Sequence, residues 1–352
     1  MRRISIGVML LLVFSLALAA CSSGGATTGE PPVVRLMTHD SFDMSAELLA
    51  EFEAETGIRA EVFKAGDGGE ILNKAILSRE SPLADVLFGV DNTFLSRALD
   101  SDLFLPYDSP VLAEIDDSLK LDPENRALPV DFGDVCLNYD VAWFDERGLP
   151  PPDDLADLAD PAYAGLTVVQ NPATSTPGLV FLMTTVDVFG EGNYLDYWRQ
   201  LVDNDVLVVD GWETAYYSHF TAASEGDRPI VVSYASSPVA EVYFAETPPS
   251  EPPTAAVVTD GTCFRQIEFV GILSGTPVEA EARQLVDFLL GRRFQEDIPL
   301  RMFVYPANET AELPEVFQQH SRISTAPVQL DPERITANRE AWIQAWTEVV
   351  LR

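Results

Sequence analysis

The sequence predicts an α/β protein with two lobes. Short β-type runs alternate with amphipathic helical segments along most of the chain, and two long extended stretches enclose its central part. The chain has 352 residues, which suits about two domains, and its 47% of hydrophobic residues is enough for a sizeable core.

The first α/β region starts at residue 33. Its expected strands are 33–37, 59–63 and 85–88. Its expected helices are 45–56, a segment after the glycine-rich turn 65–69, and a segment from about residue 93. In the first of these helices the apolar residues recur at helical spacing, and Ser45 is suited to cap its start. This β-α-β-α-β order favours a layered domain with a largely parallel sheet.

A second α/β region follows a proline-rich loop at 150–152. Its expected strands are 166–169, 206–209 and 230–234, and its expected helices are 177–188 and 194–202. The C-terminal part is expected to be helical over 278–290, 293–298 and 335–350. The two regions share no evident repeat, so we expect two different α/β units rather than two copies of one.

The extended stretches 129–139 and 261–272 are expected to cross between the lobes. A chain that leaves one lobe and returns to it makes a two-strand hinge over a cleft. Lobe one is therefore expected to contain 33–130 plus 270–352, and lobe two 131–269.

The N-terminus has the layout of a secretory signal. Two arginines precede an apolar run over 4–20 that ends in small residues. The segment up to Cys21 resembles the lipobox of bacterial lipoproteins, which implies a signal peptide over 1–20 and a lipid on Cys21. Residues 21–32 are then the anchor and a flexible tether, and the protein faces outward from the cell membrane. A simple transmembrane anchor is the alternative, although the apolar run is short for one.

Export would place the other two cysteines in an oxidising compartment. Cys136 and Cys263 fall one on each crossing stretch, and adjacent strands bring side chains within disulfide reach. We hypothesise a disulfide that pins the hinge; two buried thiols are the alternative.

The charge excludes some classes of partner. Lys and Arg total 22 against 56 for Asp and Glu, a formal net charge of −34. Nucleic acids and anionic membrane surfaces attract basic proteins, so neither is expected to bind, and contact with the membrane is expected only through the lipid. Such acidity weakly favours cationic small molecules.

Motifs for catalysis are scarce. The histidines His39, His219 and His320 form no pair at metal-ligand spacing, and the chain has no nucleophile elbow and no Walker loop. We therefore expect a binding protein with no enzyme activity, no cofactor and no metal site.

Three expected helix starts follow strands and offer N–H groups that suit a carboxylate or a phosphate. They are Asp67-Gly68-Gly69, Ser175-Thr176-Pro177 and Ser236-Ser237-Pro238. An ordinary helix cap is the alternative at each of them.

Aromatic residues gather between the second and the third of these starts. Trp212 follows an expected strand, where it could stack on a flat ring or on a cation. Core packing is the alternative, because residues 212, 216 and 220 share one face of a helix. Asp40, just after the first strand, could neutralise a positive ligand or cap the following helix.

Seven segments, in their order and spacing, resemble the thiamine-binding proteins of bacterial ABC importers. They are 38–42, 85–92, 129–133, 174–178, 211–216, 233–238 and 304–306. The resemblance implies the type 2 periplasmic-binding-protein fold, with a ligand cleft between lobes joined by a two-strand hinge. It also implies a monomer that captures thiamine or its phosphates and delivers them to an ABC permease with its cytoplasmic ATPase.

The ligand contacts of that family carry over to nine positions. They are Asp67, Gly68, Ser175, Thr176, Trp212, Tyr234, Ala235, Ser236 and Ser237. Further candidates are His39, Asp40, Tyr216 and Phe303. The chain departs from the family at His39 and Phe303, where a tyrosine and a tryptophan are expected, and at Glu70, where a hydroxyl would suit a phosphate. A carboxylate repels a phosphate, so free thiamine is favoured.

Two alternatives stay open. A ferric-ion-binding protein of the same fold would use adjacent tyrosines as ligands, and Tyr216 and Tyr217 are such a pair, although Trp212 fits an organic ring better. An exported hydrolase is the other class. Relatives of this fold that break down thiamine use a cysteine nucleophile at a helix start, whereas Cys136 and Cys263 lie in extended segments.

Overall fold

The structure is a computed structural model that describes residues 30–66 and 68–352. The expected signal peptide over 1–20, the expected lipid on Cys21 and the candidate contact Asp67 lie outside these residues. Within the described ranges, no helix combines the length and the apolar character that a bilayer crossing requires.

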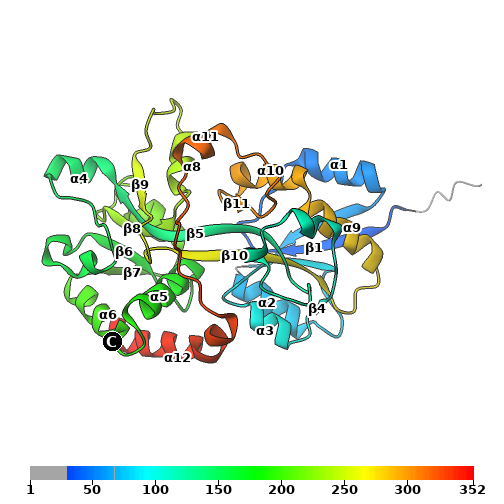
Figure 1. Ribbon diagram of the computed structural model, residues 1–352, viewed down its shortest axis with the longest axis horizontal. Coiled ribbons are helices and arrows are strands. Elements are labelled where there is room, and N and C mark those ends of the chain that lie inside the picture. Colours follow the sequence, from blue (N-terminus) through cyan, green and yellow to red (C-terminus); the bar gives the residue numbers. More distant parts are fainter. Residues whose placement is uncertain (1–29, 67) are drawn as a thin grey trace, which may run out of the picture. The chain divides into compact units, whose positions relative to one another are not determined.

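From Pro32 to Arg352 the chain forms one compact unit around a mixed β-sheet (Figure 1). Along its main path the strand order is β2 (Arg59–Lys64), β1 (Val33–Thr38), β3 (Val86–Asp91), β10 (Phe264–Leu273), β5 (Leu128–Asp140), β8 (Ile230–Tyr234), β6 (Thr167–Gln170) and β7 (Leu207–Val209). Beside this path, β4 (Phe104–Leu105) pairs with β10, and β9 (Thr254–Val257) and β11 (Tyr305–Pro306) pair with β5.

The sheet changes strand direction at its centre. β1 is parallel to β2 and β3, and β6 is parallel to β7 and β8, as the alternating sequence pattern predicts. Between these parallel sets, the long strands β5 and β10 run antiparallel to each other. These two strands connect both halves of the unit, so the expected crossing strands are confirmed.

Helices cover each half of the sheet. The first half carries α1 (Ala46–Thr56), α2 (Gly68–Leu77), α3 (Leu95–Asp100), α9 (Glu279–Leu290) and α10 (Arg292–Arg301). The second half carries α4 (Val141–Arg147), α5 (Thr176–Phe189), α6 (Tyr194–Asp203), α7 (Trp212–Thr214), the π-helix η5 (Ala215–His219), α8 (Ser237–Tyr243) and α12 (Pro332–Val350). α11 (Glu315–His320) follows β11, and short 3₁₀ turns occur at η1 (Pro110–Glu114), η2 (Asp117–Leu119), η3 (Ala156–Ala159) and η4 (Pro161–Tyr163).

Two separate hydrophobic cores define two lobes. The first core is built on β1, β3 and α9, and the second on β6, α5 and α6. α5 is apolar on all sides and is buried over 177–186, which suits a helix in the middle of a core.

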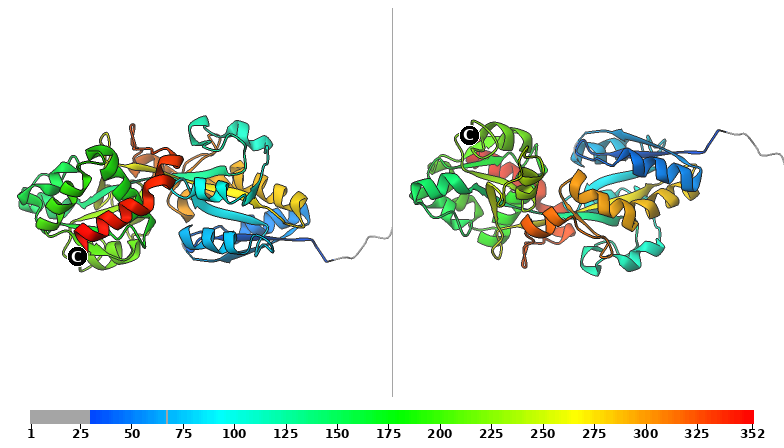
Figure 2. Two further views of the ribbon diagram at one scale, coloured as in Figure 1. Left: turned by 90° about the horizontal axis from the view of Figure 1, so that it is seen from below. Right: turned by 90° about the horizontal axis from the view of Figure 1, so that it is seen from above.

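α12 differs from the expected lobe division. The range 270–352 was expected to belong to lobe one, but Ile335, Trp342 and Trp346 lie in the second core. The reason is a third crossing: the segment before α12 runs beside β10, where the Val328 N–H donates to the Cys263 carbonyl at 2.8 Å. Figure 2 shows α12 in red along the second lobe, reaching the junction with the first.

The crossing strands are held together by covalent and ionic contacts. Cys136 on β5 and Cys263 before β10 form a disulfide, with their Cα atoms 4.3 Å apart. Near it, the Arg265 guanidinium donates to both carboxylate oxygens of buried Asp134, at 2.7 and 2.8 Å. The Ser324 N–H donates to the same carboxylate at 2.8 Å, which ties the third crossing to the other two.

Candidate ligand-binding site

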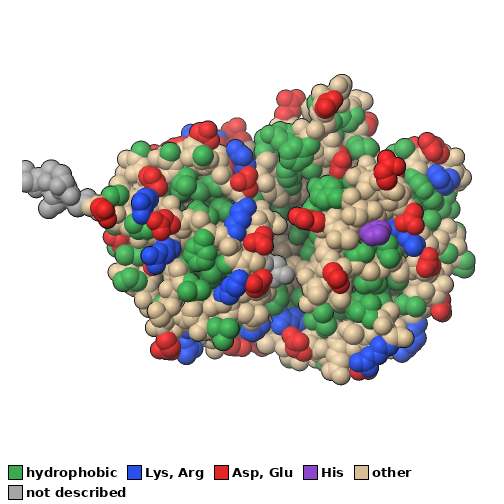
Figure 3. Space-filling view, turned by 180° about the vertical axis from the view of Figure 1, so that it is seen from behind, with side chains coloured by type: hydrophobic (Ala, Val, Ile, Leu, Met, Phe, Trp, Pro, Cys, Tyr) green, Lys and Arg blue, Asp and Glu red, His purple; other side chains and the backbone are tan. Residues whose placement is uncertain are grey.

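A cavity of about 450 Å³ lies between the lobes, within the range of about 300–1,000 Å³ usual for small-molecule sites. Its lining comes from the carboxyl ends of β1 and β3, the starts of α2, α5 and α7, the helix α8, the crossing strands and the turn after α10. Ligands of open α/β sheets bind beyond the carboxyl ends of the strands. Figure 3 shows the molecule hollowed between its two halves.

Trp212 forms an aromatic wall of the cavity. Its ring stacks on Tyr216 with the centroids 5.1 Å apart and the planes at 27°. The indole N–H donates to Ser233 Oγ at 2.9 Å, and Ser233 Oγ in turn is 2.8 Å from Ser237 Oγ. The indole is therefore fixed from behind and at its edge.

The aromatic residues 212, 216 and 220 divide between the core and the cavity. Tyr216 and Phe220 are buried in a small core, while Trp212 is only partly buried and lines the cavity. The Tyr216 hydroxyl donates to Glu241 Oε1 at 2.8 Å. Burial, together with the Glu241 charge, raises the pKa of Tyr216 well above its usual value, so this phenol keeps its proton.

Aromatic rings also stand at the rim. Phe303 has a positive φ of 55°, which is unusual for a bulky residue, and its ring contacts those of Tyr243 and Phe244. Ser236 Oγ donates to the Phe303 carbonyl at 2.5 Å and so connects α8 to the turn after α10. Strain of this kind concentrates at functional sites.

Two of the expected helix starts, those of α2 and α5, line the cavity with small residues and hydroxyl groups. Gly68 at the start of α2 and Thr176 at the start of α5 line the cavity, and the N-cap Ser175 makes no side-chain cap hydrogen bond. Their N–H groups and hydroxyls suit an anionic or hydroxyl group of a ligand. At the third start, by contrast, both serine hydroxyls are engaged within the protein.

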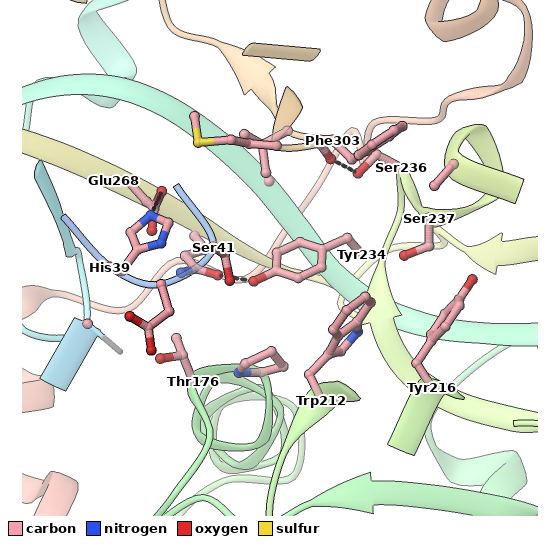
Figure 4. A pocket seen from close by; sticks show the side chains of 18 of the residues that line it. His39, Ser41, Thr176, Trp212, Tyr216, Tyr234, Ser236, Ser237, Glu268 and Phe303 are labelled. Carbon is pink, nitrogen blue, oxygen red and sulfur yellow. Dashed lines mark hydrogen bonds and ion pairs between the residues drawn. The ribbon is translucent and has the colours of Figure 1, made fainter. Parts of the chain in front are cut away.

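Acidic residues lie beneath the cavity on the crossing strands. Glu268 on β10 is the register partner of Asp131 on β5, and its Oε2 is 3.3 Å from His39 Nε2 (Figure 4). Burial opposes both charges of the His39–Glu268 pair, but their mutual attraction outweighs it. The pKa of His39 is raised and that of Glu268 is lowered.

A hydrogen-bonded chain continues from this floor. The Tyr234 hydroxyl donates to Gln266 Oε1 at 3.1 Å, and Gln266 Nε2 donates to Asp91 Oδ2 at 3.1 Å. Burial raises the pKa of Asp91 to about 6, although the Thr93 N–H and hydroxyl both donate to its other oxygen. The cavity floor therefore contains groups that titrate near neutral pH.

Local backbone geometry on the first lobe positions His39. Gly89 has a φ of 98°, and a Cβ there would come within 2.2 Å of the His39 ring. Asp40 accepts a hydrogen bond from the Gly66 N–H at 3.1 Å and so holds the glycine-rich turn. Of the two interpretations of Asp40 from sequence, the helix cap is wrong, because Asp40 orders a turn and Ser45 is the N-cap of α1. Its lining position keeps contact with a positive ligand as a prediction.

The structure brings most of the candidate residues around this cavity. Lining residues among them are Gly68, Ser175, Thr176, Trp212, Tyr234, Ser236, Ser237, His39, Asp40, Tyr216 and Phe303. Ala235 does not line it and packs with the two disulfide cysteines. Sequence reasoning missed the lining residues Asp91, Asp131, Glu241, Phe244, Gln266, Glu268 and Arg301. Their signal is weak, because most of them stand alone in apolar or extended runs.

A two-lobed α/β fold with a ligand-sized cavity between its lobes defines a solute-binding protein. The family model described as bacterial extracellular solute-binding protein matches residues 81–323, and the chain belongs to this family. The expected family resemblance is thereby confirmed.

Named relatives are similar over most of the chain. A thiamine-binding periplasmic protein of Escherichia coli is 28% identical over 326 residues, which cover 91% of this chain and 94% of that protein. A solved periplasmic thiamin binding protein has a TM-score of 0.77 at 25% identity and covers 91% of this chain and 97% of its own. Iron-bound HitA from Pseudomonas aeruginosa shares the fold, with a TM-score of 0.72 at 18% identity over 91% of this chain and 99% of its own.

Proposed function

We propose that this solute-binding protein captures thiamine in the cavity between its lobes. The observation that carries the proposal is Trp212, whose ring is backed by Tyr216, fixed at its N–H and placed against an acidic floor. A flat, positively charged ligand is complementary to both features. The relatives named as thiamine-binding, which align over about nine-tenths of the chain, support the same ligand.

Capture would work by closure of the lobes on the ligand. The cavity is lined from both lobes and from the crossing strands, so a ligand that touches all three favours the closed state. In this proposal 131–269 and α12 move against the rest of the unit. The closed form would then deliver thiamine to an ABC permease with its cytoplasmic ATPase.

Free thiamine is favoured over its phosphates. The start of α5, with Ser175 and Thr176, can accept the hydroxyethyl group or a phosphate. Glu70, however, sits in the first turn of α2, at the helix start that would share this role. Its carboxylate would repel a phosphate there, although Lys74 Nζ, 2.7 Å from Glu70 Oε1, offsets part of this charge.

Ferric iron is the second candidate, because Tyr216 and Tyr217 both line the cavity. Two observations make it the weaker one. The Tyr216 hydroxyl is committed to Glu241 and holds its proton. In the described part of the chain, no group of three or more His, Cys, Asp or Glu residues is placed to hold a metal ion.

The setting of the protein is proposed from its sequence. Cleavage before Cys21 and a lipid on that residue would keep the binding unit outside the cell, close to its permease. We propose that it acts as a monomer and performs no chemistry on the ligand.

Titration calorimetry tests the ligand. The chain from Ser22 onward, denatured and refolded to remove bound solute, would be titrated in parallel with thiamine, thiamine monophosphate, thiamine diphosphate and ferric citrate. Tight one-to-one heat with thiamine supports the proposal. Absence of heat with thiamine, together with a visible charge-transfer band on adding iron, would replace it with the iron proposal.

A further inference from the structure

The floor of the cavity contains more carboxyl groups than the one that pairs with His39. Asp131 and Glu268 face each other across β5 and β10, where opposite side chains are about 5 Å apart. Asp91 closes the group at the end of β3, and Asp91 and Asp131 are only 3% and 1% exposed.

Asp131 is the unusual member of this group. It lines the cavity and both of its carboxyl oxygens are shielded from solvent, and among the described residues the polar group that interacts with it is the Glu268 carboxyl, with no other hydrogen-bond partner. Buried carboxylates are normally paired or hydrogen-bonded, so an ionised Asp131 is disfavoured as long as the cavity holds no positive charge.

We propose that the positive charge of a bound ligand replaces a proton in the buried group of Asp131, Glu268 and His39, so that capture of a cationic solute releases about one proton. This inference rests on the proposed function, because thiamine supplies the cationic ring.

Charge balance is the central argument. The Glu268 carboxylate already balances a protonated His39, and the pair leaves no net negative charge for a ligand. A second positive charge at the floor therefore needs a second negative one. Asp131 can supply it only by losing its proton, or the pair can supply it when His39 loses its own.

The pKa shifts of Asp131 and His39 in the free protein agree with a release of protons on binding. Burial, and then the nearby Glu268 charge, raise the pKa of Asp131 well above its usual value. The pKa of His39 is raised by Glu268. A cation nearby lowers the pKa of both groups, so both changes release protons.

Other charged groups face the floor. From the ends of the neighbouring strands, Lys64 lowers and Asp40 raises the pKa of His39. The Glu268 charge raises the pKa of Asp91. Arg301 lines the cavity from α10, but its guanidinium is within 3.7 Å of Asp297 and 3.5 Å of Asp43. Asp91, with its pKa raised to about 6, is already mostly ionised near neutral pH, and none of the other groups gains a negative charge when a cation arrives.

Calorimetry in buffers of different ionisation enthalpy measures the proton count directly. At a fixed pH near neutrality, wild-type protein binding thiamine is expected to release about one proton. The matched ligand is an uncharged analogue in which the thiazolium nitrogen is replaced by carbon; it keeps the aminopyrimidine, so protonation of that ring is common to both ligands. The analogue is expected to release almost none.

Variants test whether the released proton comes from Asp131. Asp131→Asn fixes this side chain in a neutral form. If Asp131 supplies the proton, thiamine should still bind to this variant at about pH 5 but gain little affinity toward about pH 8, whereas a gain that is kept assigns the proton to His39. Wild-type affinity should rise over the same range, by at most about tenfold per pH unit. Glu213→Gln is the control, because it removes one exposed acid beside Trp212 without touching the cavity. It should release as many protons as wild type.

The outcomes separate the two levels of the proposal. If thiamine does not bind wild type at any pH, the proposed function itself is wrong. Thiamine binding without proton release, or with equal release for the uncharged analogue, overturns the inference alone. If Asp131→Asn fails to fold, the comparison of the two ligands on wild type still decides the matter.

Discussion

The first lobe meets the cavity with most of its charged groups, whereas the second lobe supplies most of its aromatic rings, together with several hydroxyl groups. His39, Asp40 and Asp91 come from the strand ends of the first lobe. Trp212, at the start of α7, and Phe244, directly after α8, come from the second. The crossing strands add the carboxyl groups of the floor between these two walls.

This asymmetry separates two tasks in recognition. A flat ring can be held by the second lobe alone, through stacking that does not require a charge. A positive charge is recognised by the first lobe and the floor. A solute with both features bridges the lobes and stabilises closure, whereas one with a single feature does not.

The largest expected effect concerns the disulfide between the crossing segments. Replacing Cys136 and Cys263 together by serine should lower the free energy of unfolding by about 2–4 kcal/mol, because the disulfide closes a long loop in the unfolded chain. Chemical denaturation measures it. The prediction is wrong if the wild-type protein has two reactive thiols and its unfolding midpoint is the same with and without reductant.

Trp212→Ala breaks the aromatic wall. Loss of stacking should weaken thiamine binding by about 1–3 kcal/mol, and the uncharged analogue should lose the same amount. Trp212→Phe is the control, since it keeps a ring. A folded alanine variant with wild-type affinity would remove Trp212 from the site.

Gly89→Ala breaks the polar wall instead. The new Cβ would collide with the His39 ring and push it from Glu268, which uncovers the Glu268 carboxylate, so the affinity for thiamine relative to that for the analogue should rise about three- to tenfold. Gly57→Ala imposes a similar left-handed strain at a φ of 69°, with nothing within 4 Å. An equal change of this ratio in the two variants would show a general effect of strain rather than a role of His39.

Much of this architecture is predictable from local patterns. The strand expected at 59–63 is observed as Arg59–Lys64 because its residues alternate, and the helix expected at 177–188 is observed as Thr176–Phe189 because Pro177 suits a helix start and a long apolar run follows it. The third crossing was missed because the segment before α12 has no periodicity. Its place depends on contacts with Asp134 and with the backbone of β10.

The site was predictable only on its helix starts and aromatic residues. Trp212 follows a strand and Thr176 precedes a proline, which are local signals. Asp131 and Glu268 give none, since each stands within an extended run and the two meet only through the register of β5 and β10. Their burial and pairing are properties of the tertiary structure.

The smallest effect sharpens the account of the aromatic wall. Ser233→Ala removes the acceptor of the Trp212 N–H, and should cost about 0.5–1.5 kcal/mol of stability and a small part of the affinity. In a Trp212→Phe background, which has no indole N–H, the same change should cost clearly less, and a double-mutant cycle measures the difference. Ser236→Ala is the matched control, because that hydroxyl bonds to the Phe303 carbonyl instead. If Ser233→Ala costs the same in both backgrounds, the hydroxyl stabilises the strand but does not orient the ring, and the rigidity of the wall must come from Tyr216.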